Sequence, residues 1–244
     1  MVINSTDNQN VRKWEKLKMK KYRDEYGLFI VQQKHMIEEA IASGTLETLL
    51  ILEGRDNPFD HEAVTVSEKV MKKLSGNVSL NDCLGICRIV EPELPEGSSY
   101  IILENVQDPG NVGTIIRTAY SLGYDAVILS PDCASLYNEK TIQSTQGALF
   151  HIPVLTRNTG ETINELKKQG IRVFATTLSS AHYLRETERC ERFALVFGNE
   201  GQGLSEETVS LCDENIKIEM ANFESLNVAI ACGICAYYFK NSLK

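Results

Sequence analysis

The hydrophobic pattern changes character at EPELPEGSS, residues 91–99, a segment rich in proline, serine and acidic residues. Before this segment, short apolar runs at 27–31 and 46–52 predict strands. Amphipathic stretches at 35–44 and 66–76 predict helices, and each of these stretches ends in a glycine that suits a helix C-terminus. The first part of the chain is therefore expected to be a small domain of mixed helices and strands.

After residue 99, apolar strands alternate regularly with amphipathic helices at 113–123 and 161–170. Such alternation is typical of an α/β domain whose parallel sheet is covered on both faces. We expect a domain at 1–92, a linker at 93–99 and a second domain at 100–244. The strands expected in the second domain are residues 100–106, 125–130, 151–155, 171–177, 193–198 and 215–220.

The last expected helix, residues 225–240, is apolar on nearly every side. Such a helix needs burial on more than one face. A second subunit could supply the additional cover. An internal core position is the other interpretation, and the sequence leaves both open.

The net charge of −8 argues weakly against a nucleic-acid partner, but the distribution of charge matters more than its sum. Residues 11–23 contain seven Lys or Arg and one Glu. Read as one helix, they place basic residues along a single stripe, which is either a solvated face or a surface that follows RNA phosphates. The residues of this stripe are Arg12, Lys16, Lys20 and Arg23.

Seven scattered cysteines include one CxxC pair, Cys232 and Cys235, inside an apolar run with no second pair. This spacing does not predict a metal site, and buried thiols in a reducing compartment explain it better. The N-terminus lacks the layout of a signal peptide, and no apolar run is long enough to span a membrane. We therefore expect a cytoplasmic protein with no membrane contact and no metal.

Three polar clusters follow expected strands of the second domain, where open α/β folds form ligand sites. The first, ENVQDPGNVGTIIRTA at 104–119, has neither the dinucleotide fingerprint nor a P-loop. Asn111 is a candidate cap of the next helix. Arg117 lies among apolar neighbours, where it either forms a structural salt bridge, with Glu104 as one candidate, or holds a phosphate.

The second cluster, FGNEGQGLSEE at 197–207, has its glycines in the reverse of the dinucleotide order, and Glu200 would repel a phosphate. A close backbone approach to a neutral or cationic ligand, such as a sulfonium, fits this loop, as does an ordinary glycine turn. In the third cluster, residues 218–233, Ser225 and Asn227 flank the start of the apolar helix. We expect Ser225 to be its N-cap.

Together, DPGNVGTIIRTA, FGNEGQGLS and ESLNVAIA resemble, in order and spacing, the three signature motifs of the SpoU family. Members of this family are RNA ribose 2′-O-methyltransferases of the SPOUT superfamily. The similarity covers about 101–240 and includes LYNEKTIQSTQGALFHIPV. The region before it, with NQNVRKWEKLKMKKYRDEYGLFIV, resembles the L30e-like substrate-binding domain of many members.

The resemblance implies a parallel α/β domain with a deep trefoil knot at its C-terminal end, an exception to the rule against threading. It also implies a homodimer formed through the knot region and the last helix. S-adenosylmethionine would be held in the knot. The cofactor-binding positions carried over are Thr176, Gly198, Ile218, Met220 and Leu226.

The catalytic positions that the resemblance implies are Asn111, Arg117, Glu200, Ser225 and Asn227. A ribose hydroxyl is a poor nucleophile until its proton is drawn away. Because an arginine does not readily lose its proton, we expect Arg117 to hold an RNA phosphate and lower the pKa of the hydroxyl. We expect Glu200 to orient Arg117.

The chain departs from the family pattern where Glu219 replaces the usual proline and the loop before ESLNV is shorter. These changes bear on cofactor affinity. By analogy, the added N-terminal domain favours ribosomal RNA over tRNA as substrate. The alternative is a catalytically weak or inactive RNA-binding or ribosome-assembly factor that retained the fold. A nicotinamide-dependent dehydrogenase is disfavoured by the reversed glycine order.

Overall fold

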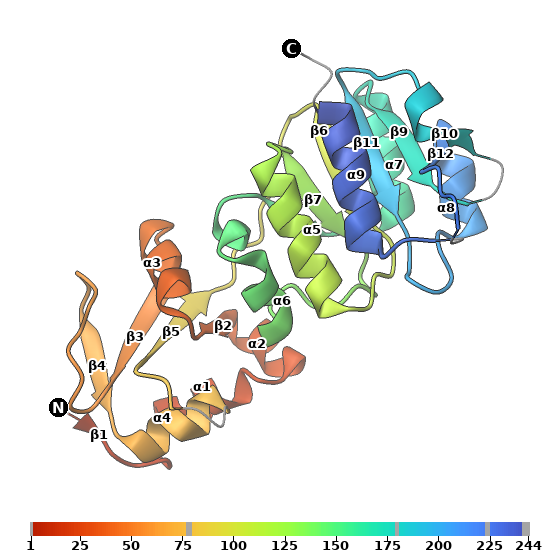
Figure 1. Ribbon diagram of the computed structural model, residues 1–244. Coiled ribbons are helices and arrows are strands. Elements are labelled where there is room, and N and C mark those ends of the chain that lie inside the picture. Colours follow the sequence, from red (N-terminus) through yellow and green to blue (C-terminus); the bar gives the residue numbers. More distant parts are fainter. Residues whose placement is uncertain (1, 77–79, 179–180, 223–224, 241–244) are drawn as a thin grey trace. The chain divides into compact units, whose positions relative to one another are not determined.

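The computed structural model describes residues 2–76, 80–178, 181–222 and 225–240 (Figure 1). The chain forms two compact units. The first contains Met1–Val90 and Tyr137–Phe150, and the second contains Glu91–Leu136 and His151–Lys244.

The first unit is built on a mixed sheet, five-stranded over the described residues, with the order β1-β4-β3-β5-β2. The neighbours β1, β4 and β3 run parallel, whereas β5 is antiparallel to both β3 and β2. In sheet order, the strands are β1 (Val2–Ile3), β4 (Ala63–Val66), β3 (Leu46–Leu52), β5 (Cys83–Arg88) and β2 (Leu28–Val31).

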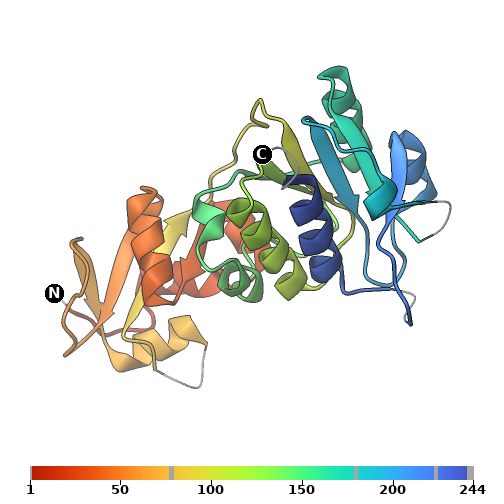
Figure 2. The same cartoon turned by 45° about the horizontal axis from the view of Figure 1, so that its top comes forward.

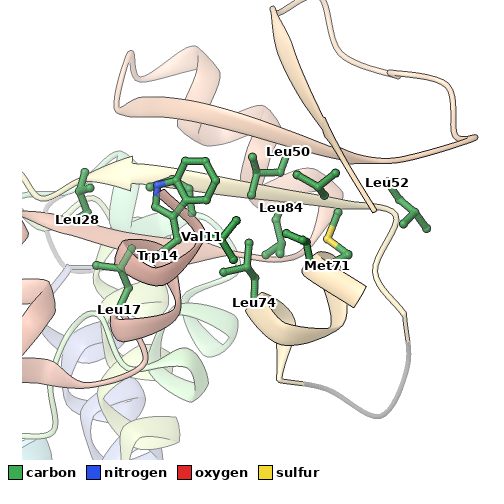
Figure 3. Packing of buried hydrophobic residues seen from close by; sticks show 12 residues of the cluster. Val11, Trp14, Leu17, Leu28, Leu50, Leu52, Met71, Leu74 and Leu84 are labelled. Atoms are coloured by element: carbon green, nitrogen blue, oxygen red, sulfur yellow. The ribbon is translucent and has the colours of Figure 1, made fainter. Parts of the chain in front are cut away.

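Successive residues of β3 point to opposite faces of this sheet, so the apolar run builds two cores at once. Leu50 and Leu52 join a core with α1 and α4, in which Trp14 lies beside the strands (Figure 3). Leu49 and Ile51 join a second core with α3 and α6. The helices of this unit are α1 (Gln9–Lys16), α2 (Lys20–Tyr26), α3 (Lys34–Ala42), α4 (Glu68–Ser75) and α6 (Glu139–Thr145), followed by the 3₁₀ turn η1 (Ala148–Phe150).

The segment Tyr137–Phe150 belongs to the first unit, although we expected it within the second domain. Ile142 is part of the second core of the first unit, and the Phe29 ring lies 4.5 Å from that of Tyr137 and 6.3 Å from that of Phe150. These apolar contacts join residues far apart in the sequence. The compact units therefore differ from the expected ranges at this segment, and the functional domain boundaries stay a prediction.

The single basic helix expected over residues 11–23 is wrong. Helix α1 ends at Lys16, and α2 begins at Lys20 after an extended Met19. Arg23 turns inward, is 6% exposed, and donates from Nη1 to the carbonyls of Leu17 and Lys18 at 3.0 Å each. These bonds satisfy the carbonyls between the two helices, so Arg23 has a structural role and does not lie on a common stripe.

The second unit is an α/β domain whose sheet, seven-stranded over the described residues, runs β10-β12-β9-β11-β6-β7-β8. Every pairing in it is parallel, which confirms the expected fold class. In sheet order, the strands are β10 (His182–Tyr183), β12 (Glu214–Lys217), β9 (Arg172–Thr176), β11 (Phe193–Phe197), β6 (Ser99–Leu103), β7 (Ala126–Leu129) and β8 (Val154–Thr156).

Helices cover both faces of this sheet. Ile163 and Leu166 of α7 pack against alternate residues of the central strands, including Ile102 and Val196. On the other face, α5 and α9 lie side by side, as both views show (Figures 1 and 2). The helices of this unit are α5 (Pro109–Ser121), α7 (Thr159–Lys168), α8 (Glu206–Leu211) and α9 (Val228–Lys240), with the 3₁₀ turn η2 (Leu184–Glu186).

Helix α9 has two different apolar sides. Cys232, Cys235 and Phe239 are buried, and the Phe239 ring lies 4.9 Å from that of Phe193. Ile230 and Tyr237 are 56% and 62% exposed. The helix is therefore an internal core helix on one side, while its other apolar side is exposed among the described residues.

The seven cysteines, all within the described residues, are free thiols, and Cys232 and Cys235 are buried as expected. Burial raises the pKa of Cys235 to about 12, so this thiol stays protonated at neutral pH. The described residues contain no cluster of metal-ligating side chains. None of the helices formed by them has the length and apolarity needed to cross a membrane.

Candidate functional site

A cavity of about 390 Å³ opens where β9, β11 and β12 end. The segments that follow these three strands form its walls, and the start of α9 closes it. All five positions expected to bind the cofactor line this cavity. They are Thr176, Gly198, Ile218, Met220 and Leu226.

The glycine-rich loop after β11 folds back on itself. Asn199 and Gly203 exchange two backbone hydrogen bonds of 3.0 and 2.9 Å, and Gly203 has a φ of +73°. A Cβ on Gly198 would lie 2.2 Å from the carbonyl carbon of Gly203. Glycine is thus required at 198 because the backbone returns against it, and at 203 because of its left-handed conformation. These two constraints explain Gly198 and Gly203 without a phosphate.

Asn199 was not singled out from the sequence, yet it organises the same loop. Its Oδ1 accepts hydrogen bonds from the backbone N–H groups of Gly201 and Gln202, and its Nδ2 donates to the Asn105 carbonyl at 2.8 Å. The side chain thus ties the loop after β11 to the loop after β6. The sequence did contain a signal for this role, because an asparagine among glycines often forms a turn in which its side chain bonds to the following backbone.

Glu200 is bound by the N-terminal end of α5. Its carboxylate accepts hydrogen bonds from the backbone N–H groups of Gln107 and Asp108, at 3.1 and 3.0 Å, and from Asn111 Nδ2 at 2.9 Å. Partial burial favours a higher pKa for Glu200, but these hydrogen bonds outweigh it and hold the pKa below its usual value. A carboxylate at a helix N-terminus also complements the helix dipole.

Two asparagine amides extend this network to α9. Asn227 Nδ2 donates to Asn111 Oδ1 at 2.9 Å, and Asn227 Oδ1 accepts from the backbone N–H groups of Ala229 and Ile230. The donor and acceptor roles in this series of hydrogen bonds are fixed at both ends. The Glu200 carboxylate can only accept, and the helix N–H groups of α9 can only donate. The three motifs identified in the sequence are therefore joined by side-chain hydrogen bonds.

Two expected helix caps are wrong. Asn227 caps α9, whereas Ser225 lies before it, exposed at the wall of the cavity. Asp108 Oδ1 accepts from the Asn111 N–H and caps α5, which begins one turn earlier than we expected, so the Asn111 side chain is available for Glu200. In both cases the helix boundary decided which polar residue became the cap.

Arg117 lies on the exposed stripe of α5 between Thr114 and Tyr120. Within the described parts of the chain, its guanidinium forms no ion pair, and Glu200 does not contact it. The expectation that Glu200 orients Arg117 is therefore wrong. The alternative, a salt bridge between Arg117 and Glu104, is also wrong. The Glu104 carboxylate instead accepts hydrogen bonds from Ser205 and Thr208.

The residue that departs from the family pattern, Glu219, adjoins the cavity rim in the chain. It lies between two lining residues, Ile218 and Met220, and its Oε1 is 2.9 Å from Arg185 Nε. Arg185 belongs to η2, just after β10. The ion pair therefore connects the wall after β12 to a neighbouring surface segment, a role that a proline could not provide.

Comparisons with known proteins agree with this geometry. Residues 98–237 match the SpoU rRNA Methylase family, and residues 8–84 match the MRM3-like substrate binding domain. The sequence is 35% identical to 23S rRNA (guanosine(2553)-2′-O)-methyltransferase RlmP of Bacillus subtilis, across 98% of this chain and 98% of that protein.

Solved structures lead to the same family. An AdoMet-bound rRNA methyltransferase from Sinorhizobium meliloti has a TM-score of 0.88 at 28% identity, covering 100% of this chain and 98% of that one. A TrmH-family protein from Porphyromonas gingivalis has a TM-score of 0.86 at 28% identity, covering 96% and 98%. With two of its motifs lining one cavity, the first motif hydrogen-bonded to both, and most of the second unit matching the family model, this chain belongs to the SpoU rRNA Methylase family.

Proposed function

We propose that this protein transfers a methyl group from S-adenosylmethionine to a ribose 2′-hydroxyl of RNA, with ribosomal RNA favoured over tRNA. The observation that carries the proposal is the cavity after β9, β11 and β12, whose walls contain all five expected cofactor positions. It is joined through Glu200 to the Asn111–Asn227 network. The full-length similarity to a 23S rRNA 2′-O-methyltransferase supports the choice of substrate.

The residues present fit this cofactor. A volume of about 390 Å³ lies within the usual range of small-molecule sites. The closely folded backbone at Gly198 leaves peptide groups along the wall, and apolar side chains such as Ile218 and Leu226 add surface for an adenine. Glu200 supplies negative charge next to the site of a sulfonium cation. The bound cofactor would supply an electrophilic methyl group.

The roles of the polar residues follow from their contacts. Glu200 is a weak base, because its pKa is lowered and its oxygens already accept three hydrogen bonds. We assign it, with Asn111 and Asn227, to holding the start of α9 against the cavity. Arg117 is exposed and unpaired among the described residues, so it can hold an RNA phosphate and stabilise the developing alkoxide. Ser225, exposed at the cavity wall, completes the set.

A homodimer formed through α5 and α9 is part of the proposal. Both helices carry exposed apolar side chains, Tyr120 on α5 and Ile230, Ile234 and Tyr237 on α9, and a second copy would cover them. The knotted path of the C-terminal segment and a cytoplasmic location also belong to it, the latter supported by seven free thiols. A molar mass measured by light scattering tests the dimer, and a monomer at micromolar concentration contradicts it.

Transfer of labelled methyl to unmodified ribosomal RNA and to tRNA, followed by nucleoside analysis, tests the reaction. We expect label in a 2′-O-methylated nucleoside of ribosomal RNA. Label on a base, or cofactor binding without transfer to ribosomal RNA or its assembly intermediates, overturns the proposal. Absence of both transfer and cofactor binding favours the alternative, an RNA-binding or ribosome-assembly factor.

Arg117→Ala sharpens the assignment. It should lower transfer by at least about a hundredfold, because a positioned charge that stabilises the transition state is lost. Cofactor affinity, measured by calorimetry, should stay within about twofold. Loss of cofactor binding in this variant would contradict the role given to Arg117.

A further inference from the structure

Most of the basic side chains that suggested an RNA surface on the first unit are already engaged. Arg12 pairs with Asp7 at 2.8 Å, and Lys20 pairs with Asp24 at 2.9 Å. Arg23 is buried against backbone carbonyls. Of the four residues expected to contact RNA, only Lys16 keeps its charge available on the described surface.

Two further lysines join Lys16 in a different arrangement. Lys13, Lys16 and Lys21 form no ion pair within the described chain, and all three lie over tyrosine rings of α2. The ammonium groups of Lys16 and Lys21 are 5.0 and 5.7 Å from the centroid of Tyr22, and that of Lys13 is 5.4 Å from the centroid of Tyr26. Cation–π attraction at these distances keeps the ammonium groups beside the rings without neutralising them.

The two rings form a stacked pair, with centroids 5.8 Å apart and planes 28° from parallel. Tyr26 packs partly against the core, which anchors the pair, while Tyr22 is half-buried at the surface. Met19, next to them in the turn, is 59% exposed. The surface therefore combines a fixed aromatic ring, an adjacent apolar side chain and three available cations.

We propose that α1 and α2 form a platform for unpaired RNA nucleotides, in which a base takes the place of the ammonium groups over Tyr22, and Lys13, Lys16 and Lys21 contact the flanking phosphates. Aromatic rings interleaved with cations are the chemistry that binds single strands, whose bases are free to stack. In a duplex the bases are already stacked inside, so a duplex would engage only the lysines. This inference rests on the proposed function, since it takes RNA to be the partner.

The same RNA strand, presented unpaired and paired, tests the proposal. The full chain is titrated against a labelled oligoadenosine of about 12 nucleotides, and against that strand annealed to oligouridine, with fluorescence anisotropy as the readout. Tyr22→Leu should weaken single-strand binding roughly tenfold, the effect of losing one base stack, and change duplex binding by less than about twofold. Tyr22→Phe should bind both forms like the parent, because it keeps the ring.

The lysines have a separate signature. Removing all three with Lys13→Gln, Lys16→Gln and Lys21→Gln should reduce the slope of log affinity against log salt by about 2, at roughly 0.7 for each lost phosphate contact. Lys34→Gln removes one charge from α3, on the opposite face of the sheet, and should leave the slope unchanged. Thermal unfolding of each variant separates loss of binding from loss of fold.

Equal losses for single strand and duplex in Tyr22→Leu, or no loss in either, would refute the platform. So would a salt slope that the triple lysine variant leaves unchanged. These failures are distinct from failure of the proposed function, because methyl transfer and cofactor binding are measured on the parent protein. A parent that methylates RNA while Tyr22→Leu binds normally refutes the platform alone. A parent that binds single strands through Tyr22 but transfers no methyl refutes the enzyme alone.

Discussion

The cavity of the second unit and the α1–α2 surface of the first unit differ in whether their polar side chains already have hydrogen-bond or ion-pair partners among the described residues. Around the cavity, Glu200, Asn111 and Asn227 satisfy one another and the backbone. On α1 and α2, Lys16 and Lys21 have only ring contacts among the described residues and keep their charge available. The first arrangement suits one small ligand of fixed shape, because its groups are preorganised. The second suits a flexible polyanion, which needs charge more than geometry.

The largest effect is expected from a change in the preorganised wall of the cavity. Gly198→Ala places a methyl group 2.2 to 2.4 Å from the backbone of Gly203 and Leu204. We expect a cost of about 3 kcal/mol and loss of measurable cofactor binding, because backbone cannot move aside as a side chain can. Calorimetric titration and denaturant unfolding measure the two effects.

Gly201→Ala is the matched control for that change. The nearest atom to its Cβ would be Asn199 Oδ1 at 3.6 Å, an ordinary contact. Stability and cofactor affinity should therefore stay close to those of the parent. If both alanine variants behave alike, the close backbone return at Gly198 is not what shapes the cavity.

A smaller effect is expected when the hydrogen bonds of the Asn111 side chain are removed. Asn111→Ala removes the donor to Glu200 and the acceptor from Asn227, and should cost about 1 to 3 kcal/mol for two lost hydrogen bonds. Thr114→Ala, one turn along on the exposed stripe of α5, should cost less than about 0.5 kcal/mol. Urea unfolding of the two variants compares them, and equal stabilities would mean that the network contributes nothing.

The charge of Glu200 predicts a pH-dependent contribution to stability. Because its folded pKa is depressed, the stabilisation is present above its unfolded value near 4.5 and is lost as pH falls through the lower folded pKa. Glu200→Gln should therefore be less stable than the parent at pH 7, by no more than about 1 kcal/mol since the group is largely exposed. The two unfolding curves should converge in acid, and a pH-independent difference would exclude the charge as the cause.

The smallest expected effect concerns the rim of the cavity. Glu219→Gln and Arg185→Gln should each weaken cofactor binding by about twofold, because a partly exposed ion pair contributes only a few tenths of a kcal/mol. High salt should reduce the difference from the parent. The double variant should bind like either single variant, and additive losses would show that the two residues act independently.

Short motifs were more reliable predictors than long periodic patterns. The resemblance to the SpoU motifs assigned the loop after β11 and the start of α9 to the cofactor site from a few residues each, and both line the cavity. The basic helix was inferred from a 3.6-residue period that assumed no interruption. The chain bends at Met19, and Arg23, which the spacing placed on that stripe, satisfies backbone carbonyls instead.

The segment Tyr137–Phe150 shows the same limit at the scale of a unit. Its sequence resembles the methyltransferase part of the family, yet its apolar side chains complete a core with Phe29. Nothing local to the segment specifies that partner. Likewise, Ser225 and Asn227 are both acceptable caps, and only the position where α9 begins selects Asn227.

By itself, the sequence determined the parallel α/β class, the alternation of apolar residues that builds it and the motifs that line the cavity. The fold class depends on local periodicity, and the motifs were assigned through their resemblance to the SpoU family; both are properties of short segments. Only the tertiary structure decided that Glu200 binds the N-terminal end of α5 and not Arg117. It also decided that lysines with no ion pair among the described residues lie over the Tyr22 ring. Those outcomes depend on which segments meet, and a polar or charged side chain takes the partners that the packed backbone places within its reach.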